Sequence, residues 1–591
     1  MNKLETLEHY FGHASFRPLQ EEVVDAIVDK RDVLMILPTG GGKSLCYQLP
    51  TLLMSGITVV ISPLLALMHD QVTALRANGI PAQMLSSMQS IEESQDIEAQ
   101  LKAGEVRLLY VAPERLVNSY FLSMLRQLPL NFFVIDEAHC VSEWGHEFRE
   151  NYRRLSLLKE HFPSTAICAF TATATYAVEH DIANNLGLQN PKRVRGSLFR
   201  KNLTIQVAHR IKDGRLQLLE FLKNHNNDSG IIYTLSRKST EAIALFLQGK
   251  GILAKPYHAG LASTEKNQTY ADFVSDRVQI VVATIAFGMG IDKSNIRFVV
   301  HMTLPKTLEN FYQEIGRSGR DGLEAQTLLL FSTQDIVQQK LFIEDLPQTP
   351  YKDHAFNKLD SMVRFANSEA CRHQSIAGYF DDRIDVCKDK CDNCTAPQSE
   401  KIDISTPAQK LLSTILRTEQ KFGLHYVIDI LRGSKDQRVL QNKHDTLSVY
   451  GIGEEYSKAQ WLTIGDKLLE LSAVELGEFK VYKLTNYGVE ILKGKHKVSL
   501  KKDRLSVQKA QAKKKVSYFD DYDVEVFDSL KALRTQIAKE ANIPPYIVFS
   551  DKTLKDLANK TPQDKAQMLD VHGIGEIKFK KYGKRFLEVL V

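Results

Sequence analysis

Three consecutive glycines followed by lysine and serine constrain the fold of this chain more than any other stretch. They follow the apolar run Val33–Leu37 and precede a helical pattern that begins at Leu45. Glycines leave backbone N–H groups open to a polyphosphate, and the positive end of a following helix points at the same place. The stretch favours a phosphate-binding loop over a plain glycine-rich turn, although Leu37 stands where the full motif has another glycine. The residues expected to bind phosphate and Mg²⁺ are Thr39, Gly40, Gly41, Gly42, Lys43 and Ser44.

Short apolar runs alternate with helical patterns twice in the first 340 residues. The first set of runs is Val33–Leu37, Thr58–Ser62, Leu108–Ala112, Phe132–Asp136 and Ala166–Thr171. The second set is Gly230–Tyr233, Gln279–Ala283, Phe298–His301 and Gln326–Phe331. Such alternation predicts parallel sheets covered by helices. We therefore expect two α/β lobes, residues 1–204 and 205–340, with a nucleotide site in the cleft between them.

The remainder of the chain divides by composition. Residues 341–398 read as helices, 399–495 as a mixed α/β segment, and 517–591 as a small helical domain. The linker between the last two, 496–516, lies in a stretch from Lys493 to Lys515 with ten Lys/Arg and one acid. That stretch is either a solvated tether or a transient phosphate contact.

Overall charge and hydropathy restrict the function less than the motifs do. A net charge of +5 over 591 residues permits a nucleic-acid partner without arguing for one. We see no signal peptide and no apolar stretch of about 18 residues that would span a bilayer. The expectation is a cytoplasmic protein.

Two acids stand directly after an apolar strand pattern. Phe132–Ile135 leads into Asp136 and Glu137, which places both carboxylates at the carboxyl edge of a sheet, where ligands bind in open α/β folds. Asp136 is predicted to hold Mg²⁺ and Glu137 to orient or deprotonate the attacking water. Surface acids after a strand are common, but the glycine loop favours the catalytic interpretation.

Two arginines follow in the second lobe, within the stretch from Gln313 to Arg320. Arginine suits phosphate oxygens because its fork is planar and its charge is permanent. An arginine that reaches across from a second lobe stabilises charge as the γ-phosphate leaves. Arg320 is the favoured finger, Arg317 has a γ-phosphate or coupling role, and Gln313 is included among the catalytic candidates.

Four of the seven cysteines cluster, with 15, three and two residues between successive members. They are Cys371, Cys387, Cys391 and Cys394. The spacing fits a tetrahedral, structural Zn²⁺ site. Disulfides are the alternative, which a cytosolic chain disfavours.

These motifs together resemble the superfamily-two helicases, and the whole chain closely resembles the RecQ family of DNA helicases. Phe16–Gln20 resembles the family's adenine-reading motif, which implies that Gln20 binds the adenine edge and that Arg17 stacks on the ring. His13 stands where many members have tyrosine. The resemblance implies two RecA-like lobes, a zinc-binding subdomain with four cysteine ligands, a winged helix and a helical HRDC domain.

The resemblance also implies DNA-contacting and coupling residues. The stretch 141–149 resembles an aromatic-rich loop, whose Trp144 and Phe148 would stack on unpaired bases. Ser62–Gln71 resembles a motif that grips the strand. The residues expected to bind DNA or couple the sites are Trp144, His146, Phe148, Arg149, Thr171, Thr173 and Thr284. Gly288 and Asp292, from the same motif as Thr284, are expected near the nucleotide.

The C-terminal modules carry further expectations. In the winged-helix segment, Val474–Leu484 is a hairpin candidate, with Phe479 and Tyr482 as wedge candidates. In the HRDC segment, the Gly573-Ile-Gly575 turn can present N–H groups to a phosphate. That domain either tunes DNA binding or docks on protein.

An ATP-dependent DNA helicase that moves 3′ to 5′ is the function that this resemblance implies. It would use ATP, Mg²⁺ and Zn²⁺, act on single-stranded and branched DNA, and work with single-strand-binding and recombination proteins in repair. The alternative is a nucleic-acid-stimulated ATPase remodeller or RNA helicase that does not unwind DNA. A non-catalytic scaffold is weaker, because every residue type that an ATPase needs is present.

Overall fold

The computed structural model describes residues 1–86, 89–142, 149–288, 293–346, 350–396, 400–476, 481–502 and 522–590. Its contacts divide the chain into two compact units. The first contains both large sheets and the C-terminal helices, and the second contains most of residues 331–518. Within the described residues, no helix combines the length and the apolar character needed to cross a membrane.

The first lobe is a seven-stranded sheet with the strand order β3-β4-β2-β5-β6-β1-β7. Every pairing in it is parallel. The strands are β1 Val33–Ile36, β2 Ile57–Ile61, β3 Ala82–Leu85, β4 Leu108–Val111, β5 Leu130–Ile135, β6 Ala166–Thr171 and β7 Lys192–Arg195. The central order brings the carboxyl ends of β1, β5 and β6 to one edge, where the phosphate loop and the paired acids begin.

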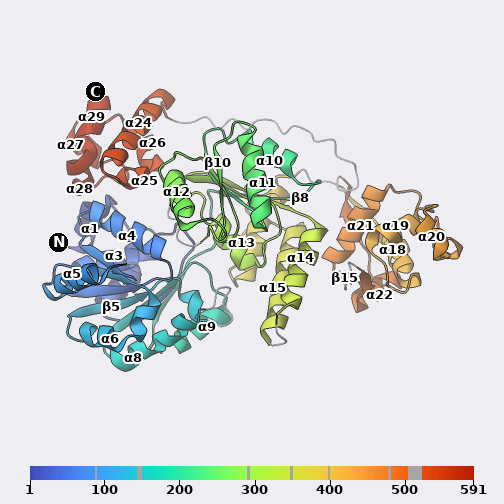
Figure 1. Ribbon diagram of the computed structural model, residues 1–591, viewed down its shortest axis with the longest axis horizontal. Helices are drawn as coiled ribbons and strands as arrows, with labels where there is room; N and C mark the ends of the chain where they lie inside the picture. The colour runs from blue at the N-terminus through green and yellow to red at the C-terminus, as the bar shows by residue number, and fades with distance from the viewer. Residues whose placement is uncertain are drawn as a thin grey trace. The chain divides into compact units, whose positions relative to one another are not determined.

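Helices cover both faces of this sheet (Figure 1). Met35 packs into a core with α2, α3 and α4, whereas Leu34 and Ile36 point into a second core with α5, α6, α8 and α9. The helices are α1 Lys3–Phe11, α2 Gln20–Val28, α3 Leu45–Leu53, α4 Leu65–Ala77, α5 Ile91–Lys102, α6 Ser119–Leu125, α7 Glu150–Arg153, α8 Leu157–His161 and α9 Tyr176–Asn185. Burial on both faces explains why these strands read as continuous apolar runs.

The second lobe is a six-stranded sheet with the order β10-β11-β9-β12-β13-β8. Its strands are β8 Leu203–His209, β9 Ser229–Tyr233, β10 Ala254–Tyr257, β11 Ile280–Ala283, β12 Ile296–His301 and β13 Ala325–Phe331. Its helices are α10 Arg215–Leu222, α11 Arg237–Gln248, α12 Ser263–Val274 and α13 Leu308–Ile315. The two α/β lobes predicted from the alternation are thereby confirmed.

The C-terminal domain is helical and has its own core around Leu530, Phe549 and Phe586. Its helices are α24 Val524–Glu540, α25 Pro545–Val548, α26 Asp551–Lys560, α27 Lys565–Leu569, α28 Glu576–Lys578 and α29 Lys584–Leu590. A π-helical turn, Phe579–Gly583, joins the last two.

The second unit is mainly helical. Its helices are α14 Thr333–Glu344, α15 Pro350–Asn367, α17 Asp392–Thr395, α18 Ser405–Arg417, α19 Leu424–Leu431, α20 Gln437–Gln441, α21 Lys458–Glu470 and α22 Asn486–Leu492. Helix α16 Arg372–Tyr379 precedes α17 in the chain but belongs, from His373 on, to the first unit. Two short antiparallel pairs complete it: β14 Lys401–Asp403 with β17 Ser499–Lys501, and β15 Val474–Leu476 with β16 Tyr482–Leu484. The predicted hairpin is therefore present. Tyr482 is only 3% exposed, so it packs inside rather than acting as a wedge, and Phe479 lies outside the described residues.

Candidate nucleotide site and zinc cluster

The glycine loop lies between β1 and α3 and adopts the backbone that its composition predicts. Gly40 and Gly42 have φ of 82° and 83°, a region that side chains disfavour. A Cβ on Gly42 would meet the Gln20 amide nitrogen at 2.4 Å. Gln20 donates to the Gly42 carbonyl at 3.2 Å and Arg17 to the Gly40 carbonyl at 2.7 Å. The two residues expected to read adenine therefore lie against the loop in this structure.

Lys43 folds back toward the strand that precedes the loop. Its ammonium donates to the carbonyl of Leu37 at 2.8 Å. Burial lowers the pKa of Lys43, while the carboxylates of Glu137 and Asp136 oppose that shift. The lysine thus lies among the acids predicted to act with it.

The paired acids follow β5 at the carboxyl edge of the sheet. The backbone N–H of Asp136 bonds to Ile61 in β2 at 2.9 Å. Burial and the neighbouring charge of Glu137 raise the pKa of Asp136, and Lys43 lowers it. Burial disfavours the charged form of this acid, and a nearby cation would stabilise that form.

Glu137 has a left-handed backbone, with φ of 49°. Its N–H donates to the Asp136 carboxylate at 3.0 Å, and its carboxylate lies 3.3 Å from Nδ1 of His139. The same nitrogen lies 3.0 Å from the hydroxyl of Thr171. A contiguous polar path therefore joins the predicted catalytic acid to one of the predicted coupling threonines.

The two arginines lie on the loop after α13. Arg317 is buried, and its Nη2 would lie 3.5 Å from a Cβ on Gly288. A Cβ on Gly40 of the phosphate loop would lie 3.4 Å from the Cα of Arg320. The second lobe thus brings the arginine loop against the phosphate loop of the first.

One cavity of about 1080 Å³ collects most of these side chains. Its lining from the first lobe includes Arg17, Gln20, Thr39, Gly40, Gly42, Lys43, Ser44, Asp136 and Glu137. Gln313, Arg317 and Arg320 line it from the second lobe. These motifs are far apart in sequence and meet around a single space.

The C-terminal domain also lines this cavity, which the sequence motifs did not indicate. His572 and Lys578 are among its lining residues, and the ring of His572 lies 5.3 Å from that of His13. The N–H of Gly573 donates to the Gly12 carbonyl at 3.2 Å. The glycine turn that was expected to present N–H groups to a phosphate therefore contacts the first lobe, and no sequence motif identifies such a docking surface.

The predicted DNA-coupling residues are described only in part. Trp144, His146, Phe148 and Asp292 lie outside the described residues. Arg149 donates to the carbonyl of Pro63, within the predicted strand-gripping motif, at 3.1 Å. Thr171 and Thr173 bond to each other after β6, and Thr284 follows β11 in the second lobe.

The four clustered cysteines meet in space. The sulfur atoms of Cys371, Cys387, Cys391 and Cys394 all lie within 4.8 Å of one another, and three of these residues are buried. Tetrahedral zinc with Zn–S bonds of about 2.3 Å places its sulfurs about 3.8 Å apart. Four thiols at this separation fit a structural zinc site, and Zn²⁺ is the metal that the cysteine spacing predicts.

Comparisons with family models cover nearly the whole chain. A DEAD/DEAH box helicase model matches residues 17–182, and a helicase conserved C-terminal domain model matches 214–322. A RecQ zinc-binding model matches residues 333–395, an RQC domain model 398–509, and an HRDC domain model 523–590. The five matched domains occur along the chain in the order that the sequence predicts.

Curated relatives match along more than nine-tenths of their length. The chain is 41% identical over 591 residues to the ATP-dependent DNA helicase RecQ of Haemophilus influenzae, covering 99% of this chain and 95% of that one. It is 42% identical over 590 residues to that of Pasteurella multocida, covering 99% and 93%. It is 39% identical over 590 residues to that of Bacillus subtilis, covering 98% and 97%.

Two parallel-sheet lobes that place a phosphate loop, paired acids and arginines around one cavity define a two-lobed nucleoside triphosphatase. Zinc-binding, RQC and HRDC modules follow these lobes in the sequence, and this combination narrows the class to one family. The chain belongs to the RecQ family of ATP-dependent DNA helicases.

Proposed function

We propose that this chain couples ATP hydrolysis to 3′-to-5′ movement on single-stranded DNA and thereby unwinds duplex and branched DNA. The observation that carries the proposal is the convergence of Lys43, Glu137 and Arg320 on one cavity from two separate lobes. An arginine that reaches a nucleotide from a second lobe ties hydrolysis to the distance between lobes. Movement along a strand follows when the lobes grip DNA alternately.

The roles of the residues follow from their chemistry. Lys43 and the loop N–H groups bind the phosphates, Glu137 orients or deprotonates the attacking water, and Arg320 stabilises charge as the γ-phosphate leaves. Arg317 contacts the γ-phosphate or couples it to the second lobe. Gln20 and Arg17 select adenine after releasing the loop carbonyls that they contact.

Mg²⁺ fits the donor set at this cavity. The Ser44 hydroxyl and the Asp136 carboxylate line it, and Mg²⁺ prefers hard oxygen ligands. When bound, the ion neutralises phosphate charge. The raised pKa of Asp136 is the expected behaviour of a buried acid that has a cation as its natural partner.

The DNA contacts rest on the family resemblance. Trp144 and Phe148 stack on unpaired bases, and His146 and Arg149 support them. Thr171, Thr173 and Thr284 relay strand occupancy to the nucleotide. The path from Thr171 through His139 to Glu137 supports such a relay within the first lobe.

Unwinding of tailed duplexes tests enzyme, substrate and polarity together. We expect the chain to unwind a 3′-tailed duplex DNA with ATP, and a 5′-tailed one far more slowly. Lys43→Ala removes the phosphate-binding ammonium and should lower DNA-stimulated hydrolysis by at least about 100-fold. Unwinding of the 5′-tailed substrate alone would contradict the polarity, and unchanged hydrolysis by Lys43→Ala would contradict the site.

The second candidate is a translocating ATPase that remodels duplex or acts on RNA without unwinding DNA. Stimulation by RNA that equals stimulation by single-stranded DNA, together with no strand separation, would favour it. We further propose that the protein works in the cytoplasm with a single-strand-binding protein and recombination proteins. These last assignments follow from the family and from no contact in the structure.

A further inference from the structure

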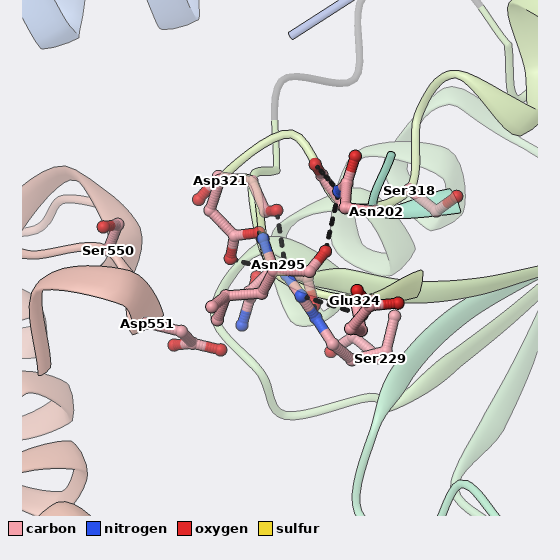
Figure 2. A network of polar contacts seen from close by, with 12 residues as sticks. Asn202, Ser229, Asn295, Ser318, Asp321, Glu324, Ser550 and Asp551 are labelled. Carbon is pink, nitrogen blue, oxygen red and sulfur yellow. Dashed lines mark hydrogen bonds and ion pairs between the residues drawn. The ribbon is translucent and has the colours of Figure 1, made fainter. Parts of the chain in front are cut away.

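A short connector joins the two lobes and contacts the arginine loop. It comprises residues 196–202, between β7 and β8, and we call the loop of residues 316–323 the finger loop because it carries Arg317 and Arg320. Figure 2 shows Asn202 of the connector beside Ser318 of the finger loop. No motif in the sequence singled out the connector.

Arg200 of the connector binds the finger loop through three backbone carbonyls. Its guanidinium donates to Gly316 at 3.0 Å, to Ser318 at 2.8 Å and to Gly319 at 2.6 Å. These carbonyls lie on either side of Arg317 and just before Arg320. Arg200 itself is only 8% exposed, so its charge is removed from water and is balanced by carbonyl dipoles.

Asn202 extends the same contact. Its side-chain amide nitrogen donates to the carbonyls of Gly319 at 2.8 Å and Leu323 at 2.7 Å. The backbone carbonyl of Asn202 accepts a hydrogen bond from the N–H of Ala325 at 2.9 Å. The Gly319 carbonyl therefore receives hydrogen bonds from both connector side chains. Two residues of the connector fix the finger loop at both of its ends.

Gly319 shows how close this contact is. Its φ is 60°, and a Cβ there would meet the Asn202 amide nitrogen at 2.5 Å and the Leu323 carbonyl at 2.8 Å. Only glycine allows the loop to approach the connector this closely. Arg297 supports the far side of the loop through an ion pair with Asp321, whose side chain is 1% exposed.

The connector arginine also lies near the phosphate loop. A Cβ on Gly40 would lie 3.9 Å from Nη2 of Arg200. Arg200 is not among the cavity-lining residues, so it stands behind the finger loop while Arg317 and Arg320 face the cavity. Its position suits a residue that orients others and does not touch the nucleotide.

We propose that Arg200 and Asn202 are positioning residues for hydrolysis: they clamp the finger loop backbone so that Arg317 and Arg320 face the γ-phosphate. This inference rests on the role proposed above for Arg320. The clamp belongs to the segment that joins the lobes, so a change in the angle between the lobes acts directly on the arginines. A lysine at position 200 keeps the charge but lacks the planar fork that serves three carbonyls at once.

The first test compares transition-state and product binding in the full-length protein. Arg200→Lys should lower kcat of DNA-stimulated ATP hydrolysis by about 100-fold, the cost expected of an ångström-scale misplacement. It should weaken binding of ADP with aluminium fluoride by a similar factor and leave binding of ADP alone within about two-fold. A fall in both affinities together would overturn the proposal, because general unfolding of the site predicts that result.

Matched variants guard against a folding defect. Arg107 also donates to three backbone carbonyls, those of Ser55, Thr51 and Met54, but at the opposite end of α3 from the phosphate loop. Arg107→Lys should leave the selectivity for aluminium fluoride unchanged. If Arg200→Lys does not fold, Asn202→Ala replaces it in the test. Asn202→Ala removes two of the clamp bonds and should give a smaller loss of the same kind. The proposal is overturned if Asn202→Ala weakens binding of ADP with aluminium fluoride no more than binding of ADP alone.

A double-mutant cycle separates this inference from the proposed function. If the clamp acts through Arg317 and Arg320, adding Arg200→Lys to a variant that carries both Arg317→Ala and Arg320→Ala should cost less than about three-fold more in kcat. If instead the losses in kcat multiply, Arg200 acts by another route. That result would overturn the clamp and leave the proposed function intact. Full activity of Arg320→Ala would contradict the role proposed for Arg320 and would remove the clamp with it.

Discussion

Glu137 is held in a left-handed backbone conformation that residues with a Cβ disfavour. A left-handed backbone costs a residue with a Cβ about 1–2 kcal/mol, yet here it places the carboxylate 3.3 Å from His139 at the cavity wall. Strain of this kind persists where the surroundings impose it, often at functional sites. The observation supports a chemical role for Glu137 beyond its position in the sequence.

Replacing this acid tests that role. Glu137→Gln keeps the size of the side chain and removes the base, so we expect kcat of ATP hydrolysis to fall by about 100-fold or more, with ATP affinity nearly unchanged. Equilibrium binding of ATP and steady-state hydrolysis measure the two effects. Glu150→Gln, at a side chain that is 79% exposed in the same lobe, is the control. An equal loss of ATP affinity would mean that Glu137 binds the nucleotide instead.

At the residue scale, sequence motifs located the cavity but not every contact. Glycine spacing and the paired acids were enough to predict that Lys43, Asp136 and Glu137 meet. Arg17 and Gln20 were expected to read adenine, and their contacts with the loop carbonyls were not predicted. A motif records which residue types occur, and the partner of a side chain depends on the tertiary structure.

At the scale of elements, the sequence predicted the central strands of the two large sheets and missed the four strands at their edges. β3, β7, β8 and β10 are the outermost strands of the two sheets. An edge strand pairs on one side only and is less covered, so it carries polar residues and even proline, as in Ala254-Lys-Pro-Tyr257. Continuous apolar runs identify strands that are buried on both faces, and edge strands lack that pattern.

The segment that carries the four clustered cysteines is stabilised by an ion pair as well as by its predicted metal. Arg372, next to Cys371, makes a two-pronged ion pair with Asp392, next to Cys391, with both N–O distances at 3.0 Å. A bidentate pair of this kind fixes the backbone on either side of two predicted ligands. The ion pair thus orients the backbone beside two of the four cysteines.

Removal of one ligand should show that the metal stabilises this segment. Cys391→Ser is expected to reduce zinc from about one equivalent per chain to a small fraction, and to lower thermal stability, because structural zinc contributes folding free energy directly. Metal analysis and calorimetry measure both. Cys168→Ala, at a buried cysteine in β6 outside the cluster, should retain its zinc. Full zinc content in Cys391→Ser would refute the assignment.

At the scale of the whole molecule, the C-terminal domain contacts the first lobe at the cavity. The Gly573–Gly12 hydrogen bond and the approach of Lys581 to the Ala77 carbonyl at 2.6 Å hold it there. Docking of one domain on another leaves little trace in sequence, since its residues are ordinary surface types. This explains why the module was recognised and its contact was not.

Docking of this domain should depend on pH. Burial, together with the neighbouring charges of His572, Arg17, Lys578 and Lys552, lowers the pKa of His13 from 6.5 to about 4. The docked form therefore binds fewer protons than the undocked form between these values, so docking is complete above about pH 6.5 and weakens as pH falls toward 4. We expect the equilibrium constant for docking to be about 30-fold lower at pH 5 than at pH 7.5.

Hydrogen exchange at the Gly573 amide of the full-length protein measures this effect, after correction for intrinsic exchange rates. His13→Gln removes one titrating ring and should flatten the pH dependence, though His572, whose pKa burial also lowers, retains part of it. Equal protection at both pH values would contradict the prediction.

The clamped connector also bears on how the chain tolerates length changes. Loops between domains usually accept insertions, but only four residues lie between Arg195 at the end of β7 and Arg200, and both ends are anchored. One extra residue here would shift the guanidinium by a residue length along the backbone and away from its carbonyls. Among natural variants and engineered chains, this stretch should therefore keep a fixed length.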